Sequence, residues 1–210
     1  MNDSSSLKNW FLDIIARKPS GWVGRFIYGR LSGMEATDAR VIEALDLRAN
    51  DVFLEIGQGA GLLVKKVLQT VDRAAAIDHS ADMVALAKRN NREAVAAGRA
   101  DILCGDATSL PWPDNHFTCG ACIATFLFFD EPAVALREVL RVLGPGGRFV
   151  IATPSSEGEG MLPRLFGRWP EKAYLYGRDQ MQELLHEAGF EDIDVELSRG
   201  RLWCTFSGPV

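Results

Sequence analysis

A glycine-rich segment directly after a short apolar run is the part of the sequence best suited to holding a ligand. Residues 55–61 read Glu-Ile-Gly-Gln-Gly-Ala-Gly, and a short buried strand is expected over 52–56. Glycines at a turn from strand to helix let the backbone approach a ligand without interference from Cβ atoms. The helix expected over 62–71 offers free N–H groups and the positive end of its dipole. A carboxylate or a phosphate group could therefore bind at this turn.

The spacing of these glycines differs from the dinucleotide-binding motif. That motif is Gly-x-Gly-x-x-Gly, which counted from Gly57 requires a glycine at position 62. Position 62 is a leucine, and the glycines are instead Gly57, Gly59 and Gly61. An acid, Glu55, precedes the first glycine by two residues.

Two further acids follow the next two expected strands. Asp78 ends an apolar strand expected over 74–77, and Asp106 follows a strand expected over 101–104. A carboxylate at the first of these positions can accept hydrogen bonds from both hydroxyls of a ribose. A carboxylate at the second can accept a hydrogen bond from an adenine amino group. Together with the glycine turn, these acids indicate a ligand that contains adenosine.

Strands and helices are expected to alternate through the middle of the chain. The later members of this series are a strand over 117–125, a helix over 132–143, a turn over 144–147 and a strand over 148–152. Such alternation implies parallel strands joined by helical crossovers. Near the end, a helix with a capping box at Asp179 and Gln182 precedes an antiparallel strand pair over 191–197 and 202–206.

These motifs together resemble the class I S-adenosylmethionine-dependent methyltransferases, in particular the group that includes the ubiquinone and menaquinone C-methyltransferases. The resemblance covers about residues 35–207 and is most specific in VFLEIGQGAG at 52–61, AIDHSADMV at 77–85, CGDATSLPWPDNHF at 104–117 and LREVLRVLGPGGRFVIATP at 136–154. It implies an α/β fold with a Rossmann-like, doubly wound, seven-stranded sheet. The sheet is expected to be mostly parallel, with the last strand antiparallel and helices on both faces. S-adenosyl-L-methionine is the implied cofactor.

The resemblance also implies a role for each part of the site. The glycine turn holds the methionine end of the cofactor, Asp78 binds the ribose, and Asp106 holds the adenine. Ala124 and Thr125 border the reactive sulfonium, and Glu55 often acts indirectly. The implied cofactor-binding residues are Glu55, Gly57, Gln58, Gly59, Gly61, Asp78, His79, Met83, Gly105, Asp106, Ala107, Ala124 and Thr125.

Two segments are expected to cover the acceptor side of the site. Residues 1–34 are predicted to form a helical lid or extension on a methyltransferase domain over 35–210, and residues 154–176 form a long loop or cap. Candidate acceptor-binding residues are Tyr28, Phe126, Phe129, Phe166 and Trp169. The expected reaction is in-line methyl transfer to a small apolar or aromatic organic acceptor, without an assigned catalytic residue.

Two alternatives remain open at this point. Residues 1–30 contain five basic residues against two acidic ones, a net charge of +3, and an apolar stripe. Peripheral contact of residues 7–30 with a membrane would suit a lipid or a prenylated quinone as the acceptor. The other alternative is a module that binds an adenosyl ligand without catalysis.

The overall composition is that of an ordinary globular protein. The chain has 210 residues, of which 47% are apolar, and its formal net charge of −5 argues against a nucleic-acid partner. Its apolar runs are too short for a membrane span and its start lacks a signal-peptide pattern, so a cytoplasmic location is expected. Cys119 and Cys122 should face opposite sides of a strand, so neither a metal site nor a redox pair is expected. The oligomeric state and the methylated atom are left open.

Overall fold

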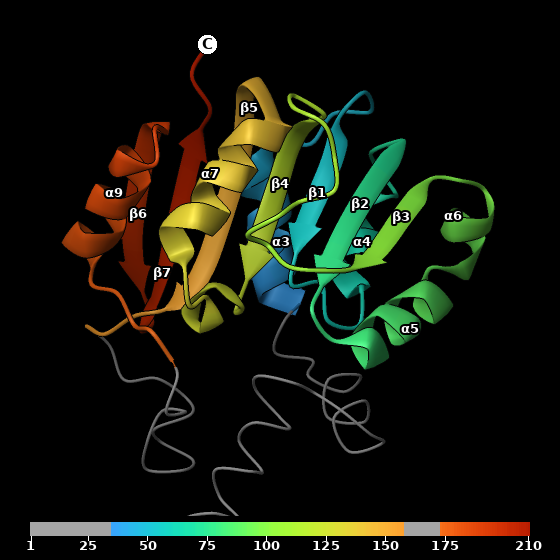
Figure 1. Cartoon of the computed structure of the whole chain (residues 1–210), viewed down its shortest axis with the longest axis horizontal. Coiled ribbons are helices and arrows are strands. Elements are labelled where there is room, and N and C mark those ends of the chain that lie inside the picture. Colours follow the sequence, from blue (N-terminus) through green and yellow to red (C-terminus); the bar gives the residue numbers. More distant parts are fainter. Residues whose placement is uncertain (1–34, 158–172) are drawn as a thin grey trace, which may run out of the picture.

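The computed structural model describes residues 35–157 and 173–210, which form a seven-stranded sheet with helices on both faces (Figure 1). The strand order is β3-β2-β1-β4-β5-β7-β6. The strands are β1 (Val52–Ile56), β2 (Arg73–Asp78), β3 (Ala100–Cys104), β4 (Phe117–Ile123), β5 (Leu143–Pro154), β6 (Glu191–Ser198) and β7 (Arg201–Ser207). Strands β1 to β5 pair in parallel, whereas β7 runs antiparallel to both β5 and β6. The predicted fold, including its antiparallel last strand, is confirmed.

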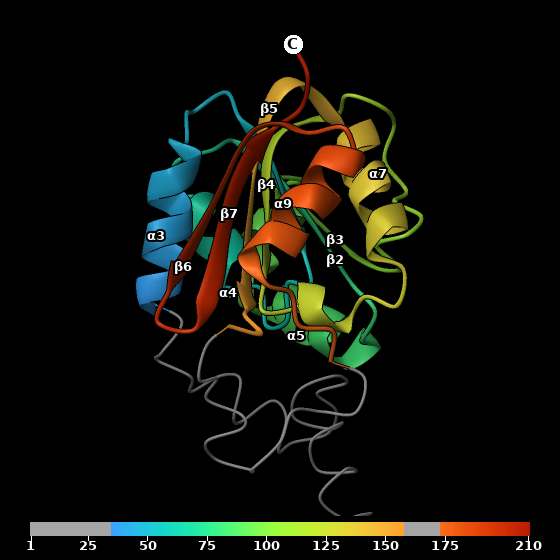
Figure 2. The ribbon, with the colours of Figure 1, turned by 90° about the vertical axis from the view of Figure 1, so that its left-hand side faces the viewer.

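Helices cover both faces of this sheet, as the turned view in Figure 2 shows. The described helices are α3 (Glu35–Leu45), α4 (Leu62–Val67), α5 (Ala81–Asn90), α6 (Arg92–Ala96), the 3₁₀ helix η3 (Phe126–Phe128), α7 (Pro132–Val142) and α9 (Arg178–Glu187). Because successive strand residues point to opposite faces, Phe53 packs with α3, α4 and α5, whereas its neighbour Leu54 packs with α7 and α9. Among the described helices, none is long and apolar enough to cross a membrane.

The order of the strands determines where a ligand can bind. The chain winds outward from β1 through β2 to β3, and then returns to the other side of β1 with β4 and β5. In open α/β sheets, ligands bind beyond the carboxyl ends of the strands at the point where this order reverses. Here that point lies between the ends of β1 and β4, at the lower edge of the sheet in Figure 1.

Several predicted boundaries were wrong. The capping box expected at Asp179 and Gln182 is not formed, because α9 begins at Arg178 after the N-cap Gly177; the Gly177 N–H instead donates to Gln180 Oε1 at 3.0 Å. Strand β4 ends at Ile123 since Ala124 has a left-handed φ of 54°. The Gly-Pro-Gly-Gly turn lies within the bounds of β5, where the pairing with β4 shifts register.

The prediction that Cys119 and Cys122 face opposite sides of a strand is confirmed. Cys119 belongs to the core under α3, α4 and α5, and Cys122 belongs to the core under α7 and α9. Both thiols are free and buried. Burial raises the pKa of Cys119 to about 12 and raises that of Cys122 further. Such thiols are inert at neutral pH.

Candidate functional site

The glycine turn joins β1 to α4 with backbone angles that glycine adopts readily. Gly57, Gly59 and Gly61 have φ values of 74°, 48° and 69°. A Cβ atom at Gly57 would also collide with the side chain of Thr125, which follows β4. Thr125 Oγ1 lies 3.4 Å from the carbonyl oxygen of Gly57. The first glycine therefore lets the ends of β1 and β4 approach each other at the point where the strand order reverses.

Asp78 is the last residue of β2, and each oxygen of its carboxylate accepts a hydrogen bond from a backbone N–H group. Its Oδ2 accepts the N–H of Gly59 at 3.0 Å, and its Oδ1 accepts the N–H of Ser80 at 2.9 Å. Ser80 in turn caps α5, with its side chain accepting the Met83 N–H at 3.4 Å. His79 Nδ1 lies 3.5 Å from Asp78 Oδ1. These contacts orient a buried carboxylate at the strand tip, where each oxygen keeps a further lone pair for a ligand.

Asp106 follows β3 and is oriented by its own loop. Its Oδ1 accepts hydrogen bonds from both the N–H and the hydroxyl of Thr108, each at 2.8 Å. These bonds lower the pKa of the Asp106 carboxyl below its ordinary value. Among the described residues, Oδ2 has no hydrogen-bond partner. This exposed oxygen is therefore ionised and available to accept a hydrogen bond.

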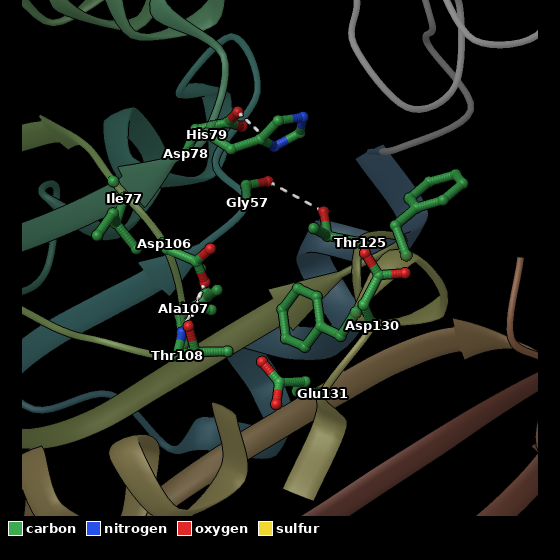
Figure 3. Close-up of a pocket in the computed structure, with 14 residues that line it drawn as sticks. Gly57, Ile77, Asp78, His79, Asp106, Ala107, Thr108, Thr125, Asp130 and Glu131 are labelled. Carbon is green, nitrogen blue, oxygen red and sulfur yellow. Dashed lines mark hydrogen bonds and ion pairs between the residues drawn. The ribbon is translucent and has the colours of Figure 1, made fainter. Parts of the chain in front are cut away.

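The ends of the first four strands enclose a cavity of about 270 Å³ (Figure 3). Its lining consists of Ile56, Gly57, Ile77, Asp78, His79, Gly105, Asp106, Ala107, Thr108, Thr125, Phe128, Phe129, Asp130 and Glu131. In Figure 3, Asp106 and Thr125 lie on opposite sides of Gly57. The cavity thus joins the two acid-tipped strands to the residues that follow β4.

The structure brings together only part of the predicted site in this lining. The predicted residues that line the cavity are Gly57, Asp78, His79, Gly105, Asp106, Ala107, Thr125 and Phe129. The predicted residues that lie outside the lining are Glu55, Gln58, Gly59, Gly61, Met83, Ala124 and Phe126. Met83 is fully buried beneath α5. Tyr28, Phe166 and Trp169 lie outside the described residues, as do the predicted N-terminal extension and most of the predicted loop over 154–176.

Six lining residues were not predicted. They are Ile56, Ile77, Thr108, Phe128, Asp130 and Glu131. Thr108 carried a signal in the sequence, because a threonine two residues after an aspartate often completes such a turn. Phe128, Asp130 and Glu131 depend on the 3₁₀ helix η3, which turns the chain back over the cavity after β4. Nothing in the periodicity of the sequence marked that helix.

Part of the chain matches a known protein family. A family model described as "Methyltransferase domain" matches residues 54–151, which include the glycine turn and both acids. The demethylmenaquinone methyltransferase of Paenarthrobacter aurescens is 33% identical over 112 residues, which are 53% of this chain and 42% of that one. The chain thus spans less than half the length of this curated relative.

Solved structures share the fold of this chain. The [4+2]-cyclase SpnF superposes with a TM-score of 0.72 at 27% identity, covering 87% of this chain and 84% of that one. Residues 54–151 are a methyltransferase domain. The phosphoethanolamine N-methyltransferase 2 of Haemonchus contortus, solved with S-adenosyl-L-methionine, shares the fold of this chain, with a TM-score of 0.78 at 18% identity over 95% of this chain and 60% of that one. The match over residues 54–151 agrees with the predicted family.

Buried polar atoms that lack a hydrogen-bond partner indicate where a polar ligand could bind. In the described part of the chain they are Glu55 Oε2, Gln58 Nε2, Gln58 Oε1, Asn91 Oδ1 and Thr153 Oγ1. Three of these five atoms lie in residues 55–58, and Asn91 donates its Nδ2 to the Gly61 carbonyl at 2.9 Å. Buried polar groups normally have partners. Unused hydrogen-bonding capacity therefore gathers at the glycine turn, which fits a polar ligand there.

Glu55 is a buried acid at the base of the glycine turn, and its surroundings shift its pKa. Burial raises the pKa of its carboxyl well above the ordinary value, and the nearby Asp38 raises it further. The backbone N–H of Val64, in the first turn of α4, acts in the opposite direction. Asp38 itself is paired with Lys66 at 2.8 Å. Burial therefore disfavours the charged form of Glu55 at the base of the turn.

Aromatic rings pack behind the residues that follow β4. Phe126 is buried and lies 5.2 Å from Phe129 and 5.6 Å from Tyr176 between ring centroids. Tyr174 donates its N–H to the Leu127 carbonyl in η3 at 2.7 Å, and it donates its hydroxyl to Asp130, which follows η3, at 3.1 Å. The residues that precede α9 are thus fixed against η3, while Phe128 and Phe129 line the cavity together with Asp130 and Glu131. In the described part of the chain, no group of histidine, cysteine or acidic side chains could hold a metal ion.

Proposed function

We propose that this protein transfers the methyl group of S-adenosylmethionine to a small apolar or aromatic organic acceptor. The observation that carries the proposal is that a single cavity contains Asp78 and Asp106 as well as Thr125 and two phenyl rings. The acids suit an adenosine, and the rings suit an apolar molecule. Donor and acceptor could therefore meet in one enclosed space.

The adenosine half is supported by the state of the two carboxylates. Asp78 is oriented by two backbone N–H groups, so it can accept the ribose hydroxyls without first becoming ordered. Asp106 presents an ionised oxygen, which an adenine amino group can approach. Ile56 and Ile77 supply apolar surface in the same cavity. In this proposal the adenine lies against Ala107 and the ribose against Asp78.

The acceptor half is supported by the residues that follow β4. Thr125 reaches the Gly57 carbonyl, and Phe128 and Phe129 line the cavity beyond it. Bound S-adenosylmethionine supplies an electrophilic methyl group, so the protein needs mainly to align the acceptor and exclude water. Phe129 can do both because it is fixed against Phe126. No residue is assigned as a catalytic base.

The experiment that tests this proposal is an acceptor screen with the full chain. Purified protein and S-adenosylmethionine are incubated with aromatic phenols, amines, thiols and quinols, and release of S-adenosylhomocysteine is measured. We expect release above background with aromatic acceptors, and loss of that release in a Phe129→Ala variant. Release that never exceeds background, although the cofactor binds, would favour an adenosyl-ligand-binding module over a methyltransferase.

A prenylated quinone acceptor is the second candidate. The relative from Paenarthrobacter aurescens is a demethylmenaquinone methyltransferase, and the matched region includes the cofactor half of the fold. A prenyl tail would require an apolar path out of the cavity or contact with a membrane. Two comparisons test this candidate: turnover of naphthoquinols with and without a prenyl tail, and flotation of the full chain with liposomes. Equal turnover and no flotation would leave the small acceptor as the sole candidate.

A further inference from the structure

The lining of the cavity carries more negative charge than an adenosine requires. Asp78 and Asp106 are the acids proposed to hold the ribose and the adenine, and Asp130 and Glu131 line the same cavity. Among the described lining residues there is no lysine or arginine, and His79 is the one side chain that can become positive. Two carboxylates therefore remain for a part of the ligand other than its adenosine.

The two additional acids lie directly before α7, at the end of the cavity that the acceptor is proposed to occupy. Asp130 is oriented there, because its Oδ1 accepts the Tyr174 hydroxyl at 3.1 Å. In the view of Figure 3, Asp130 lies nearer to Thr125 and Glu131 lies nearer to Thr108. Thr125 stands where the adenosine half and the acceptor half of the proposed arrangement meet. The charge of Asp130 thus adjoins the place where the methyl group would be transferred.

Stabilisation of α7 does not account for both of these acids. The N-terminus of a helix carries about half an elementary charge, which two carboxylates exceed. Glu131 is the N-cap residue of α7, but its side chain makes no capping hydrogen bond. The pair therefore leaves a net negative charge beside the cavity, which favours a positively charged ligand group there.

We propose that Asp130 and Glu131 make the cavity select the sulfonium cation of S-adenosylmethionine over neutral S-adenosylhomocysteine. The inference rests on the proposed function, because it takes the bound ligand to be the cofactor proposed for this cavity. The two molecules share the adenosine and the amino-acid end, and they differ by the methyl group and the positive charge on sulfur. The two carboxylates attract that charge and have no such effect on the neutral sulfur.

Methyl transfer would remove this attraction as the product forms. The bond between sulfur and the methyl carbon breaks and leaves its electron pair on sulfur, while an electron pair of the acceptor forms the new bond to that carbon. The positive charge therefore passes from sulfur to the methylated acceptor, which releases a proton where it has one. The neutral product binds more weakly than the cofactor, so fresh cofactor displaces it.

Calorimetric titration of the 210-residue chain tests the inference with three ligands. They are S-adenosylmethionine, S-adenosylhomocysteine and sinefungin, which carries an ammonium group in place of the methyl sulfonium. The variants are Asp130→Asn and Glu131→Gln, which remove the charge and keep the shape of the side chain. The matched control is Asp179→Asn, which neutralises an exposed acid in the first turn of α9, outside the cavity lining.

The expected effect is modest because both carboxylates are exposed and water screens them. Each variant should raise the Kd for the two cationic ligands by about threefold, the size of an interaction between exposed charges. The double variant should raise it by about tenfold, since the two charges act independently. The Kd for S-adenosylhomocysteine should stay unchanged, and the control variant should bind all three ligands as the wild type does.

Two results would overturn the inference while leaving the proposed cofactor in place. Equal loss of affinity for all three ligands would show that the acids support the shape of the site, and unchanged affinity for both cations would show that their charge does not reach the ligand. If the wild type binds none of the three ligands, the proposed function itself fails.

The salt dependence of the wild type gives a second readout, which does not depend on the folding of a variant. The Debye length falls from about 10 Å at 0.1 M salt to about 3 Å at 1 M, so attraction between exposed charges weakens over this range. We expect the Kd for S-adenosylhomocysteine divided by that for S-adenosylmethionine to fall by about threefold or more. A quotient that is independent of salt would overturn the inference.

Discussion

The backbone N–H of Gly59 donates a hydrogen bond of 3.0 Å to Asp78 Oδ2, which ties the glycine turn after β1 to the tip of β2. The other oxygen of this carboxylate accepts from the first residue before α5. Asp78 also lines the cavity. One side chain thus sets the shape of the turn and presents a charge to a ligand.

Replacing Asp78 with alanine is expected to abolish cofactor binding. The change removes the proposed partner of the ribose hydroxyls and frees the turn, so the Kd for S-adenosylhomocysteine should rise by about 100-fold or more. Asp72→Ala, an exposed acid just before β2, serves as the control and should leave binding unchanged. Both are measured by calorimetric titration. Wild-type affinity in Asp78→Ala would remove the assignment of this residue to the ribose.

Replacing Gly57 with alanine separates steric contact from backbone strain. Gly57 and Gly98 have similar φ values of 74° and 68°, but only a Cβ at Gly57 meets other atoms, those of Thr125. Gly98→Ala should therefore cost about 1 kcal/mol of unfolding free energy, and Gly57→Ala about 3 kcal/mol. Urea denaturation measures both. The double variant Gly57→Ala with Thr125→Ala should regain part of the loss, and equal costs in the two single variants would contradict the contact.

The pH dependence of binding should follow the carboxyl group of Asp106. Thr108 lowers its pKa below the ordinary value of 3.8, so the ionised form is present above that value and is lost only at lower pH. Thr108→Val removes one of the two hydrogen bonds to Oδ1 and should raise the pKa. Binding of S-adenosylhomocysteine should then begin to weaken at a higher pH than in the wild type. Identical pH profiles would show that Asp106 does not contact the ligand.

Thiol reactivity should distinguish Cys104 from the other cysteines. Cys104 is exposed, whereas Cys119, Cys122 and Cys204 are buried. Burial raises the pKa of Cys119 and of Cys204 to about 12, so neither forms a thiolate at neutral pH. We expect a chromogenic disulfide reagent to modify one thiol per chain rapidly in the native state and all four after unfolding. Rapid reaction of a second thiol, or a Cys104→Ser variant that still reacts at once, would contradict this arrangement.

The positions of the acids and of the first glycine at the strand ends were predictable from the sequence. Asp78 and Asp106 each follow an apolar run, so their places at the carboxyl edge follow from strand direction alone. Gly57 was marked by its spacing after β1. The number of strands and the antiparallel last strand came from the resemblance to a family, because alternation of strands and helices implies only a parallel sheet.

The remainder of the site depends on tertiary packing that local patterns do not encode. Met83 was expected to border the adenosine, but it is 0% exposed because it faces the core from the first turn of α5. Asp130 and Glu131 reach the cavity only because η3 reverses the chain after Ala124. The unpaired state of the Gln58 amide is likewise a property of burial. The sequence placed that residue in the turn without showing that its side chain is enclosed.

Titration of the 210-residue chain with S-adenosylmethionine and S-adenosylhomocysteine tests the central claim most directly. The cavity at the ends of β1 to β4 predicts saturable one-to-one binding of both ligands in a calorimeter. Competition between the two ligands would show that they share this site, and Asp78→Ala should remove both signals. Absence of heat from either ligand, with protein that is folded by circular dichroism, would contradict the assignment of this cavity to the cofactor.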